Sequence, residues 1–498
     1  MRWRLCVLFW ASVVLAGSLV AGLHGRHLQN TIELRPDSLK YHFLAANLLL
    51  GKGYVDHPVM AISLYGEPTE KYYSALTPQP EKKGTFARTP IYPLFLALIY
   101  WIHGIDPDVV QYYQLGLEFI LGGAMVWIAT LILGDAGLLA GVVAAYLYGM
   151  NQDLAYPAGR LLTECLASFW IVVIALLCPY IKTNRPFFES LAGAAMGLAT
   201  LTRPALVFLA PAYMLFFIPW KKSLIGTEFR RLAWFFLSFL FIVACWSLYA
   251  SISSGRFILL STMGQAPIYV GIDPVRVAIH EGLPVPAIDK ESLGKFWCCV
   301  FTGHFDGNGR EIIHNIPFRL SEVFKIMVIK VRNGFDWMPR GLAMTIFLGA
   351  AFFFQTMVIK SSTGPAPGSL PDTTLHKLAC GAVTLVLALW ILGHSHPVFL
   401  SLFLLSCMAI AGFGRPIHIV SGRALSLPVG VRGYMSFFLV GYLLTILTTL
   451  SIPRFIYPFM PIFYIYASSS IVLLGLALRN MVTIWKKQQS LSAPARPD

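Results

Sequence analysis

Several ionisable and aromatic side chains in this sequence could together bind an anionic group and activate a hydroxyl. Asp37 lies in RPDSLKYHF, and a carboxylate of this kind can take the proton of an attacking hydroxyl. Arginine guanidinium groups bind phosphate through paired hydrogen bonds and stabilise the negative charge of a departing phosphate. The candidate site residues are Asp37, Tyr41, Arg88, Glu164, Arg203, His394, His396 and Arg454. We predict that Asp37 is catalytic and that the others bind the substrate.

Each of these residues, considered alone, has a simpler explanation. Asp37 could cap the helix that begins beside it, and Tyr41, one turn later, could anchor that helix at a membrane interface. Arginines at the ends of apolar segments often extend to the phosphates of bulk lipid, and histidines in a turn are often solvated. Glu164 is harder to explain in this way, because an acid at the membrane edge costs free energy unless it is paired. Glu118, inside an apolar segment, is predicted to be a buried hydrogen-bonding group.

The composition predicts an all-α polytopic membrane protein. Of the 498 residues, 56% are hydrophobic and 12% are charged, whereas an ordinary soluble domain has about 25% charged residues. Apolar runs of roughly the 20 residues that a spanning helix needs recur along the chain. The net charge of +14 is attributed to cations that flank these runs and face lipid head groups, so no nucleic-acid partner is expected. The eight cysteines have no zinc-ligand spacing.

About twelve segments are predicted to span the membrane, and both termini are predicted to be cytoplasmic. Lys and Arg lie mainly in the loops that this count assigns to the inside, as expected for cytoplasmic loops. The first segment has an apolar part of about 19 residues, longer than the core of a signal peptide, and is interpreted as an uncleaved helix. The predicted spans are 5–24, 112–133, 136–150, 160–181, 187–202, 204–220, 232–251, 341–359, 377–393, 397–413, 433–451 and 455–478.

Two long segments, 25–111 and 252–340, are then outside. Within the first, 38–51 is predicted to be a helix, and 90–103 is an apolar segment too short to span, which could lie in the membrane interface. Residues 1–480 are assigned to one membrane-embedded module and 481–498 to a cytoplasmic tail. On this topology all the candidate site residues come from outer connections. Their location on one side of the membrane favours a shared site over a separate explanation for each residue.

A polyprenyl-phosphate sugar suits a site of this kind. Its tail would stay in lipid, its anionic phosphate would bind cations at the interface, and its sugar carbon would be attacked from the aqueous side. The arginines are then candidates for the phosphate clamp, and Asp37 is the candidate general base.

The sequence resembles the GT-C superfamily of membrane glycosyltransferases, in particular the group of protein O-mannosyltransferases and the lipid A aminoarabinose transferase. The resemblance is carried, in order, by RPDSLKYHFLAANLLLGKGY, ARTPIYPLFLALIY, GRLLTECLASF, GLATLTRPALVFLAP, GRFILLSTMGQAPIYVGIDP and PRFIYPFMPIFYIYAS. It implies an inverting hexosyl or pentosyl transfer from a lipid-monophosphate sugar at the outer face of the cell (inner or plasma) membrane. It also implies that Asp37 is the base and that Arg88, Glu164 and Arg454 match the family's site residues, with Arg203 a less certain match.

The sequence departs from that group at Asp37-Ser38, where the mannosyltransferases favour two consecutive acids, and at MGQAPIYVGIDP. The sugar stays open, as does the acceptor, which could be a protein, a lipid or a glycan. No cofactor is required by the pattern, although Asp37, Asp153 and Glu164 could together hold a divalent metal. The alternatives are a polymerase or ligase of surface polysaccharide, which would use a diphosphate-linked donor, and a lipid or solute transporter, which would carry polar groups near mid-bilayer.

Overall fold

The computed structural model describes residues 2–32, 34, 36–55, 86–178, 186–217 and 225–262, together with short stretches between 437 and 472. These described residues form helices and turns, and no β-strand occurs among them. The helices are α1 (Arg2–Gly25), α2 (Pro36–Leu49), α4 (Ile91–His103), α5 (Pro107–Leu133), α6 (Ala136–Gly149), α7 (Gln152–Ala155), α8 (Glu164–Leu177), α9 (Pro186–Thr202), α10 (Leu209–Phe217) and α11 (Ile225–Ser254), with 3₁₀ helices η2 (Pro204–Phe208) and η6 (Tyr457–Phe459).

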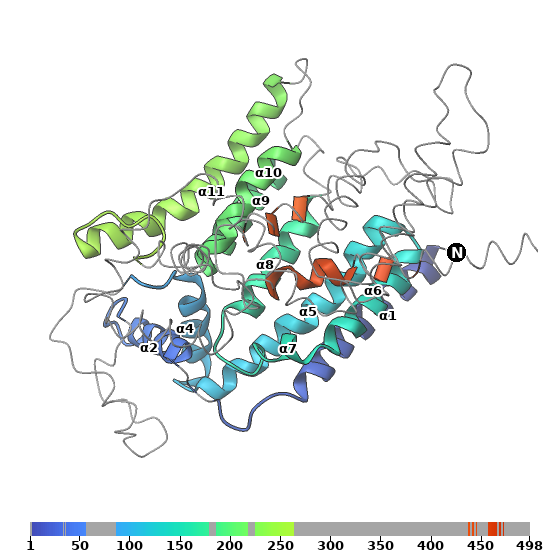
Figure 1. Cartoon of the computed structure of the whole chain (residues 1–498), viewed down its shortest axis with the longest axis horizontal. Coiled ribbons are helices and arrows are strands. Elements are labelled where there is room, and N and C mark those ends of the chain that lie inside the picture. Colours follow the sequence, from blue (N-terminus) through green and yellow to red (C-terminus); the bar gives the residue numbers. More distant parts are fainter. Residues whose placement is uncertain are drawn as a thin grey trace, which may run out of the picture.

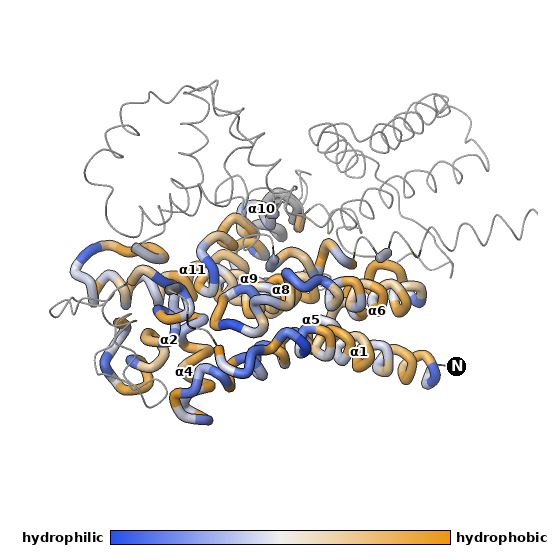
Figure 2. Tube along the Cα trace, turned by 60° about the horizontal axis from the view of Figure 1, so that its bottom comes forward, coloured by the Kyte–Doolittle hydropathy of each residue, from blue (hydrophilic) through white to orange (hydrophobic). Residues whose placement is uncertain are grey.

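The chain is a helical membrane protein. Three described helices are long and apolar enough to cross a bilayer, Trp3–Gly25, Pro107–Leu133 and Leu232–Ser254, and Figure 2 shows the long hydrophobic stretches of α1 and α5. They coincide with three of the predicted spans. α6, α8 and α9 also match predicted spans but have only 14, 14 and 17 residues. The predicted spans from 341–359 to 397–413 lie outside the described residues, so the count of twelve stays a prediction.

Small residues allow α1, α5 and α6 to pack closely. A Cβ atom on Gly122 of α5 would lie 2.6 Å from the backbone oxygen of Ala16 in α1, so only glycine permits this approach. Gly141 of α6 meets the backbone of Val126 in α5 in the same way, and Gly193 of α9 meets the backbone of Phe235 in α11. Close contacts through small residues are typical of helices in membranes, where apolar side chains alone give no preference for a protein neighbour.

Two predicted elements differ in detail from the structure. The predicted span 160–181 becomes α8, which begins at Glu164, while residues 160–163 form a loop that leads into it. The predicted span 204–220 consists of the 3₁₀ helix η2 followed by the short helix α10. Pro204 opens η2, and the residue before it, Arg203, is extended (φ −146°, ψ 108°), as a proline requires of its predecessor.

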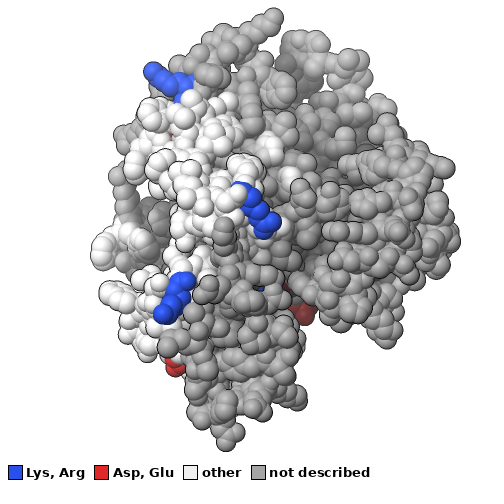
Figure 3. Space-filling view, turned by 90° about the vertical axis from the view of Figure 1, so that its left-hand side faces the viewer, with Lys and Arg blue, Asp and Glu red and all other residues white. Residues whose placement is uncertain are grey.

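The helices α2 and α4 lie together at one end of the bundle, at the lower left of Figure 1, away from the N-terminus. α4 is amphipathic, because Tyr92, Leu96, Ile99 and Tyr100 are buried while Trp101 on the other face is largely exposed. α4 contacts both α5 and α9. This end of the bundle also carries separate Lys and Arg side chains on the described surface, rather than one basic patch (Figure 3).

Candidate functional site

Asp37 and Arg88 form an ion pair, although 51 residues separate them in sequence. Arg88 Nη2 donates a hydrogen bond to Asp37 Oδ1. Asp37 lies in the first turn of α2, where a negative side chain is favoured by the helix dipole, and Arg88 lies in the turn that precedes α4. The side chains of Asp37 and Arg88 are 32% and 19% exposed, so the pair is accessible to a ligand.

Two aromatic residues hold Arg88 in place. Its guanidinium carbon lies 5.5 Å from the ring centroid of Tyr41, at a cation–π distance, and Tyr41 is one helical turn after Asp37. The hydroxyl of Tyr54 donates a 3.0 Å hydrogen bond to the backbone oxygen of Arg88. Both the backbone and the side chain of Arg88 are therefore fixed by the segment that contains α2.

A second ion pair lies deeper. Arg203 Nη1 is 3.2 Å from Glu164 Oε1, and the two side chains are only 9% and 1% exposed. Arg203 also donates to Thr163 Oγ1 at 3.2 Å, and Thr163 Oγ1 lies 3.5 Å from Glu164 Oε2. Glu164 begins α8, and Arg203 follows the last residue of α9, so this pair joins two helix ends. The pairing accounts for an acid at this depth, because a buried charge requires a partner.

The two ion pairs belong to one neighbourhood. Thr89, next to Arg88, donates through its hydroxyl to the backbone oxygen of Thr202, next to Arg203, at 3.3 Å. Tyr92 lies between the pairs: its ring packs edge-on against Tyr41 with centroids 5.0 Å apart. Burial raises the pKa of Tyr92 well above its usual value, and the nearby Cys165, Tyr100, Tyr41 and Glu164 raise it further. The Tyr92 hydroxyl therefore remains a neutral donor at physiological pH.

We call Asp37, Tyr41, Arg88, Glu164 and Arg203 the paired-charge site. The structure brings these five predicted residues together from α2, the turn before α4, α8 and the α9–η2 junction. His394, His396 and Arg454, also predicted to bind the substrate, lie outside the described residues. The site's two carboxylates and two guanidinium groups balance in charge.

The metal alternative receives no support from the described part of the chain. No group of three His, Cys, Asp or Glu side chains within it is arranged to hold a metal ion. Asp153, one of the three candidate ligands, is exposed in α7. Glu164 is engaged by Arg203 instead.

Sequence reasoning missed three residues that support the site: Tyr92, Gln114 and Thr163. Gln114 is fully buried and accepts a 2.9 Å hydrogen bond from the Tyr92 hydroxyl. A signal for Gln114 was present in the sequence, because Gln111, Gln114 and Glu118 share one face of a largely apolar helix. Thr163 gave no such signal, since its role depends on Arg203, which arrives from a distant part of the chain.

Comparisons with known proteins give only remote similarities. No family model matches the sequence, and no curated protein matches it. Among solved structures, the oligosaccharyltransferase of Archaeoglobus fulgidus aligns in its apo form with a TM-score of 0.44 and 11% identity. The archaeal oligosaccharyltransferase AglB from Archaeoglobus fulgidus, in complex with an inhibitory peptide and a dolichol-phosphate, aligns with a TM-score of 0.43 and 10% identity. Both alignments cover 100% of this chain and 53% of the other, so this chain spans about half the length of those proteins. Similarity of this extent carries no argument about activity.

Proposed function

We propose that this chain is a glycosyltransferase that moves a sugar from a polyprenyl-monophosphate donor to an acceptor hydroxyl at the outer face of the membrane. The observation that carries the proposal is the Asp37–Arg88 ion pair, which is partly exposed and lies beside the amphipathic helix α4. It offers a base and a phosphate ligand within one hydrogen bond of each other. The ordered set of sequence segments that resemble the GT-C superfamily supports the same reaction.

The surroundings of Arg88 suit a lipid-linked phosphate. α4 follows Arg88 directly and exposes Leu98, Trp101 and Ile102, which are 56%, 72% and 54% exposed. An apolar helix face of this kind is stabilised when it is buried at the boundary between head groups and acyl chains. A donor whose tail stays in the bilayer would place its phosphate at the depth of Arg88, where a guanidinium can bind two phosphate oxygens.

In the proposed reaction the acceptor oxygen attacks the anomeric carbon of the sugar. The bond between that carbon and the phosphate oxygen breaks, the configuration inverts, and the polyprenyl phosphate departs with the bonding electrons. The acceptor proton passes to Asp37. Arg88 stabilises the charge that develops on the phosphate.

The ion pair adds an order to these events. Asp37 and a donor phosphate compete for the same guanidinium of Arg88. A phosphate bound to Arg88 weakens the interaction of Arg88 with Asp37, and the loss of this positive partner makes the carboxylate more basic. The base therefore becomes active when the donor is present. We propose that the buried Glu164–Arg203 pair is a further substrate-binding element of the site, as the sequence predicts. His394, His396 and Arg454 remain predicted further contacts.

The test is sugar transfer by the purified protein in lipid nanodiscs, with matched monophosphate-linked and diphosphate-linked donors. We expect covalent product from the monophosphate donor and near-complete loss of turnover in Asp37→Asn. The control is Asp135→Asn, the same change at an exposed acid in the turn between α5 and α6. Product from the diphosphate donor alone would favour a polysaccharide polymerase or ligase. Movement of lipid across the membrane without covalent product would favour a transporter.

A further inference from the structure

The N-terminal half of α5 carries a row of polar residues on one face. Asp108, Gln111, Gln114 and Glu118 are spaced by three, three and four residues, which places them along one side of the helix. Gln111, Gln114 and Glu118 are at most 1% exposed. A buried amide or carboxylate costs free energy unless it is hydrogen-bonded, so the partners of this polar face explain its presence.

The first two residues of the polar face fix the link between α1 and α2. Asp108 Oδ1 accepts a 2.6 Å hydrogen bond from the backbone N–H of Ile32. Gln111 exchanges two hydrogen bonds with the backbone of Gln29: its Oε1 accepts at 3.1 Å and its Nε2 donates at 2.9 Å. α2 begins four residues after Ile32, so these hydrogen bonds attach the chain to α5 shortly before α2.

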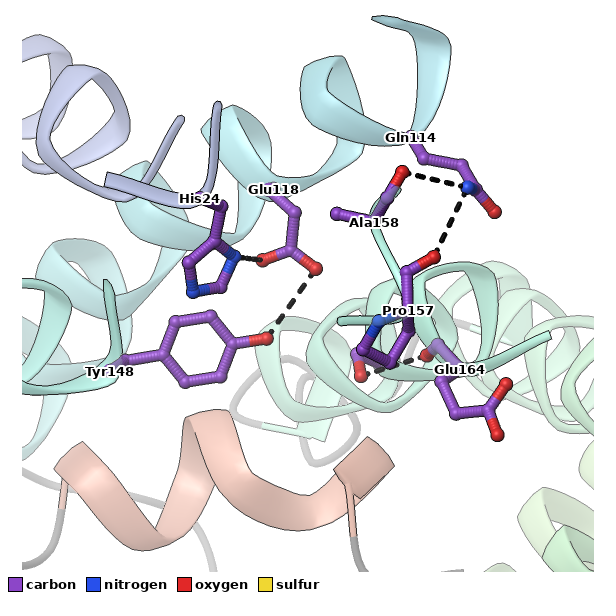
Figure 4. A network of polar contacts seen from close by, with 8 residues as sticks. His24, Gln114, Glu118, Tyr148, Pro157, Ala158 and Glu164 are labelled. Carbon is purple, nitrogen blue, oxygen red and sulfur yellow. Dashed lines mark hydrogen bonds and ion pairs between the residues drawn. The ribbon is translucent and has the colours of Figure 1, made fainter. Parts of the chain in front are cut away.

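Gln114 connects the two halves of the paired-charge site. Its Oε1 accepts from Tyr92, whose ring packs on Tyr41 beside Arg88. Its Nε2 donates to the backbone oxygens of the loop that leads to Thr163 and Glu164. Those contacts are at 2.6 Å to Arg160, 3.0 Å to Ala158 and 3.3 Å to Pro157, and Figure 4 shows the last two.

Glu118 completes the row at the bundle core. Its Oε2 lies 3.3 Å from His24 Nδ1 at the end of α1, and its Oε1 lies 3.5 Å from the Tyr148 hydroxyl of α6 (Figure 4). The polar face therefore joins α1, the α1–α2 link, α4, α6 and the loop before α8 to one rigid helix.

We infer that the polar face of α5 sets the distance between the Asp37–Arg88 pair and the Glu164–Arg203 pair, and that Gln114 is its central positioning residue. This inference rests on the proposed function, because the two pairs need a fixed separation only if they act on one substrate. A side-chain amide suits the position because it accepts from a hydroxyl on one side and donates to carbonyls on the other. A carboxylate of the same size can accept the hydrogen bond from Tyr92 but cannot donate to the loop. It would instead be repelled by the three carbonyl oxygens.

Three variants separate the two connections. Gln114→Glu keeps the acceptor for Tyr92 and breaks the contacts with the loop. Tyr92→Phe removes the hydroxyl and keeps the ring against Tyr41. Gln114→Met removes both connections at similar volume. Gln152→Glu, at an exposed glutamine in α7, is the matched control for the charge introduced.

The experiment combines hydrogen–deuterium exchange of residues 157–163 with kinetics and with binding of polyprenyl monophosphate, on the full chain in nanodiscs. We expect faster exchange of this loop in Gln114→Glu and Gln114→Met but not in Tyr92→Phe or Gln152→Glu. All three variants of the connections should lower kcat by about tenfold to a hundredfold, the range expected for a displacement of reacting groups by an ångström or less. Binding of polyprenyl monophosphate should stay within about twofold of wild type, because Arg88 itself is intact.

Two outcomes would overturn the inference. Unchanged exchange of the loop in both Gln114 variants would show that Gln114 does not hold it. If the wild-type protein is active, faster exchange of the loop in the Gln114 variants together with a wild-type kcat would show that the Gln114 contact has only a structural role. Failure of the proposed function is recognised separately, as a wild-type protein that transfers sugar from neither donor, and the exchange result still decides whether Gln114 holds the loop.

Discussion

The carboxylate of Asp37 accepts a hydrogen bond from the guanidinium of Arg88, so the candidate base and the candidate phosphate ligand are each other's partners when no substrate is bound. The proton-accepting role assigned to Asp37 and the phosphate-binding role assigned to Arg88 are therefore coupled through this one hydrogen bond. An anion that binds Arg88 must therefore weaken the hydrogen bond between Arg88 and Asp37.

Asp37→Asn should bind polyprenyl monophosphate several-fold more tightly than wild type while turnover is lost. The substitution removes both a negative charge near the phosphate and a competitor for Arg88. Titration of the purified variant with polyprenyl monophosphate, followed by native mass spectrometry, measures the affinity. Weaker binding in this variant would contradict competition between the carboxylate and the phosphate.

Arg88→Lys should weaken the same binding by about tenfold and lower turnover. Lysine keeps the positive charge but cannot form the paired hydrogen bonds of a guanidinium or stack on Tyr41 as arginine does. Arg256→Lys, at an exposed arginine after α11, is the matched control and should behave as wild type. Equal affinities in the two variants would exclude Arg88 as a phosphate ligand.

The buried Glu164–Arg203 pair should show strong coupling in a double-mutant cycle. Replacing either partner alone leaves the other charge buried without this counter-ion, which typically costs about 3–5 kcal/mol. Glu164→Gln and Arg203→Met should each lower the unfolding free energy by an amount in this range, and the double variant should recover part of the loss. Thermal or denaturant unfolding in detergent gives the values. Additive losses in the double variant would be inconsistent with a direct interaction.

The sequence predicted the elements better than it predicted their contacts. The helices α2 and α4 were expected at 38–51 and 90–103 and occur at Pro36–Leu49 and Ile91–His103, because apolar periodicity and prolines are local signals. The gathering of Asp37, Arg88, Glu164 and Arg203 at one end could be foreseen from topology alone. Their pairing could not, since each pair joins segments that are distant in the chain and meet only through packing. The polar helix face that Gln114 shares with Gln111 and Glu118 indicated that Gln114 is buried and hydrogen-bonded, but not what it contacts, because three of its partners are backbone oxygens of a loop with no sequence signature.

His42 predicts a loss of stability at acidic pH. It is fully buried in α2, its Nδ1 lies 2.9 Å from the Tyr100 hydroxyl of α4, and burial lowers its pKa from 6.5 to about 4. The unfolded chain therefore binds a proton at this position at a higher pH than the folded protein does. The stabilising contribution is complete above pH 6.5 and is lost as the pH falls toward 4, a change of roughly 3 kcal/mol for this difference in pKa.

The pH dependence can be assigned to His42 by comparing unfolding of wild type and His42→Gln between pH 7.5 and 4.5. The variant should lose less stability over this range. His103→Gln, at an exposed histidine at the end of α4, should retain the wild-type slope. A wild-type slope in His42→Gln would assign the acid sensitivity to other groups.

Two glycines of the same helix should respond in opposite ways to one added methyl group. In α5, a Cβ atom on Gly122 would meet the backbone of Ala16 in α1, whereas nothing lies within 4 Å of the corresponding position on Gly116. Gly122→Ala should therefore force α1 and α5 apart and cost about 1–3 kcal/mol, the range for overpacked interiors. Gly116→Ala should be neutral or slightly stabilising, because alanine restricts the unfolded chain more than glycine does. Unfolding of both variants in one detergent measures the contrast. Equal stability of the two variants would show that α1 and α5 do not pack through Gly122. The position of the α1–α2 link, which precedes Asp37, would then depend on the hydrogen bonds of Asp108 and Gln111 alone.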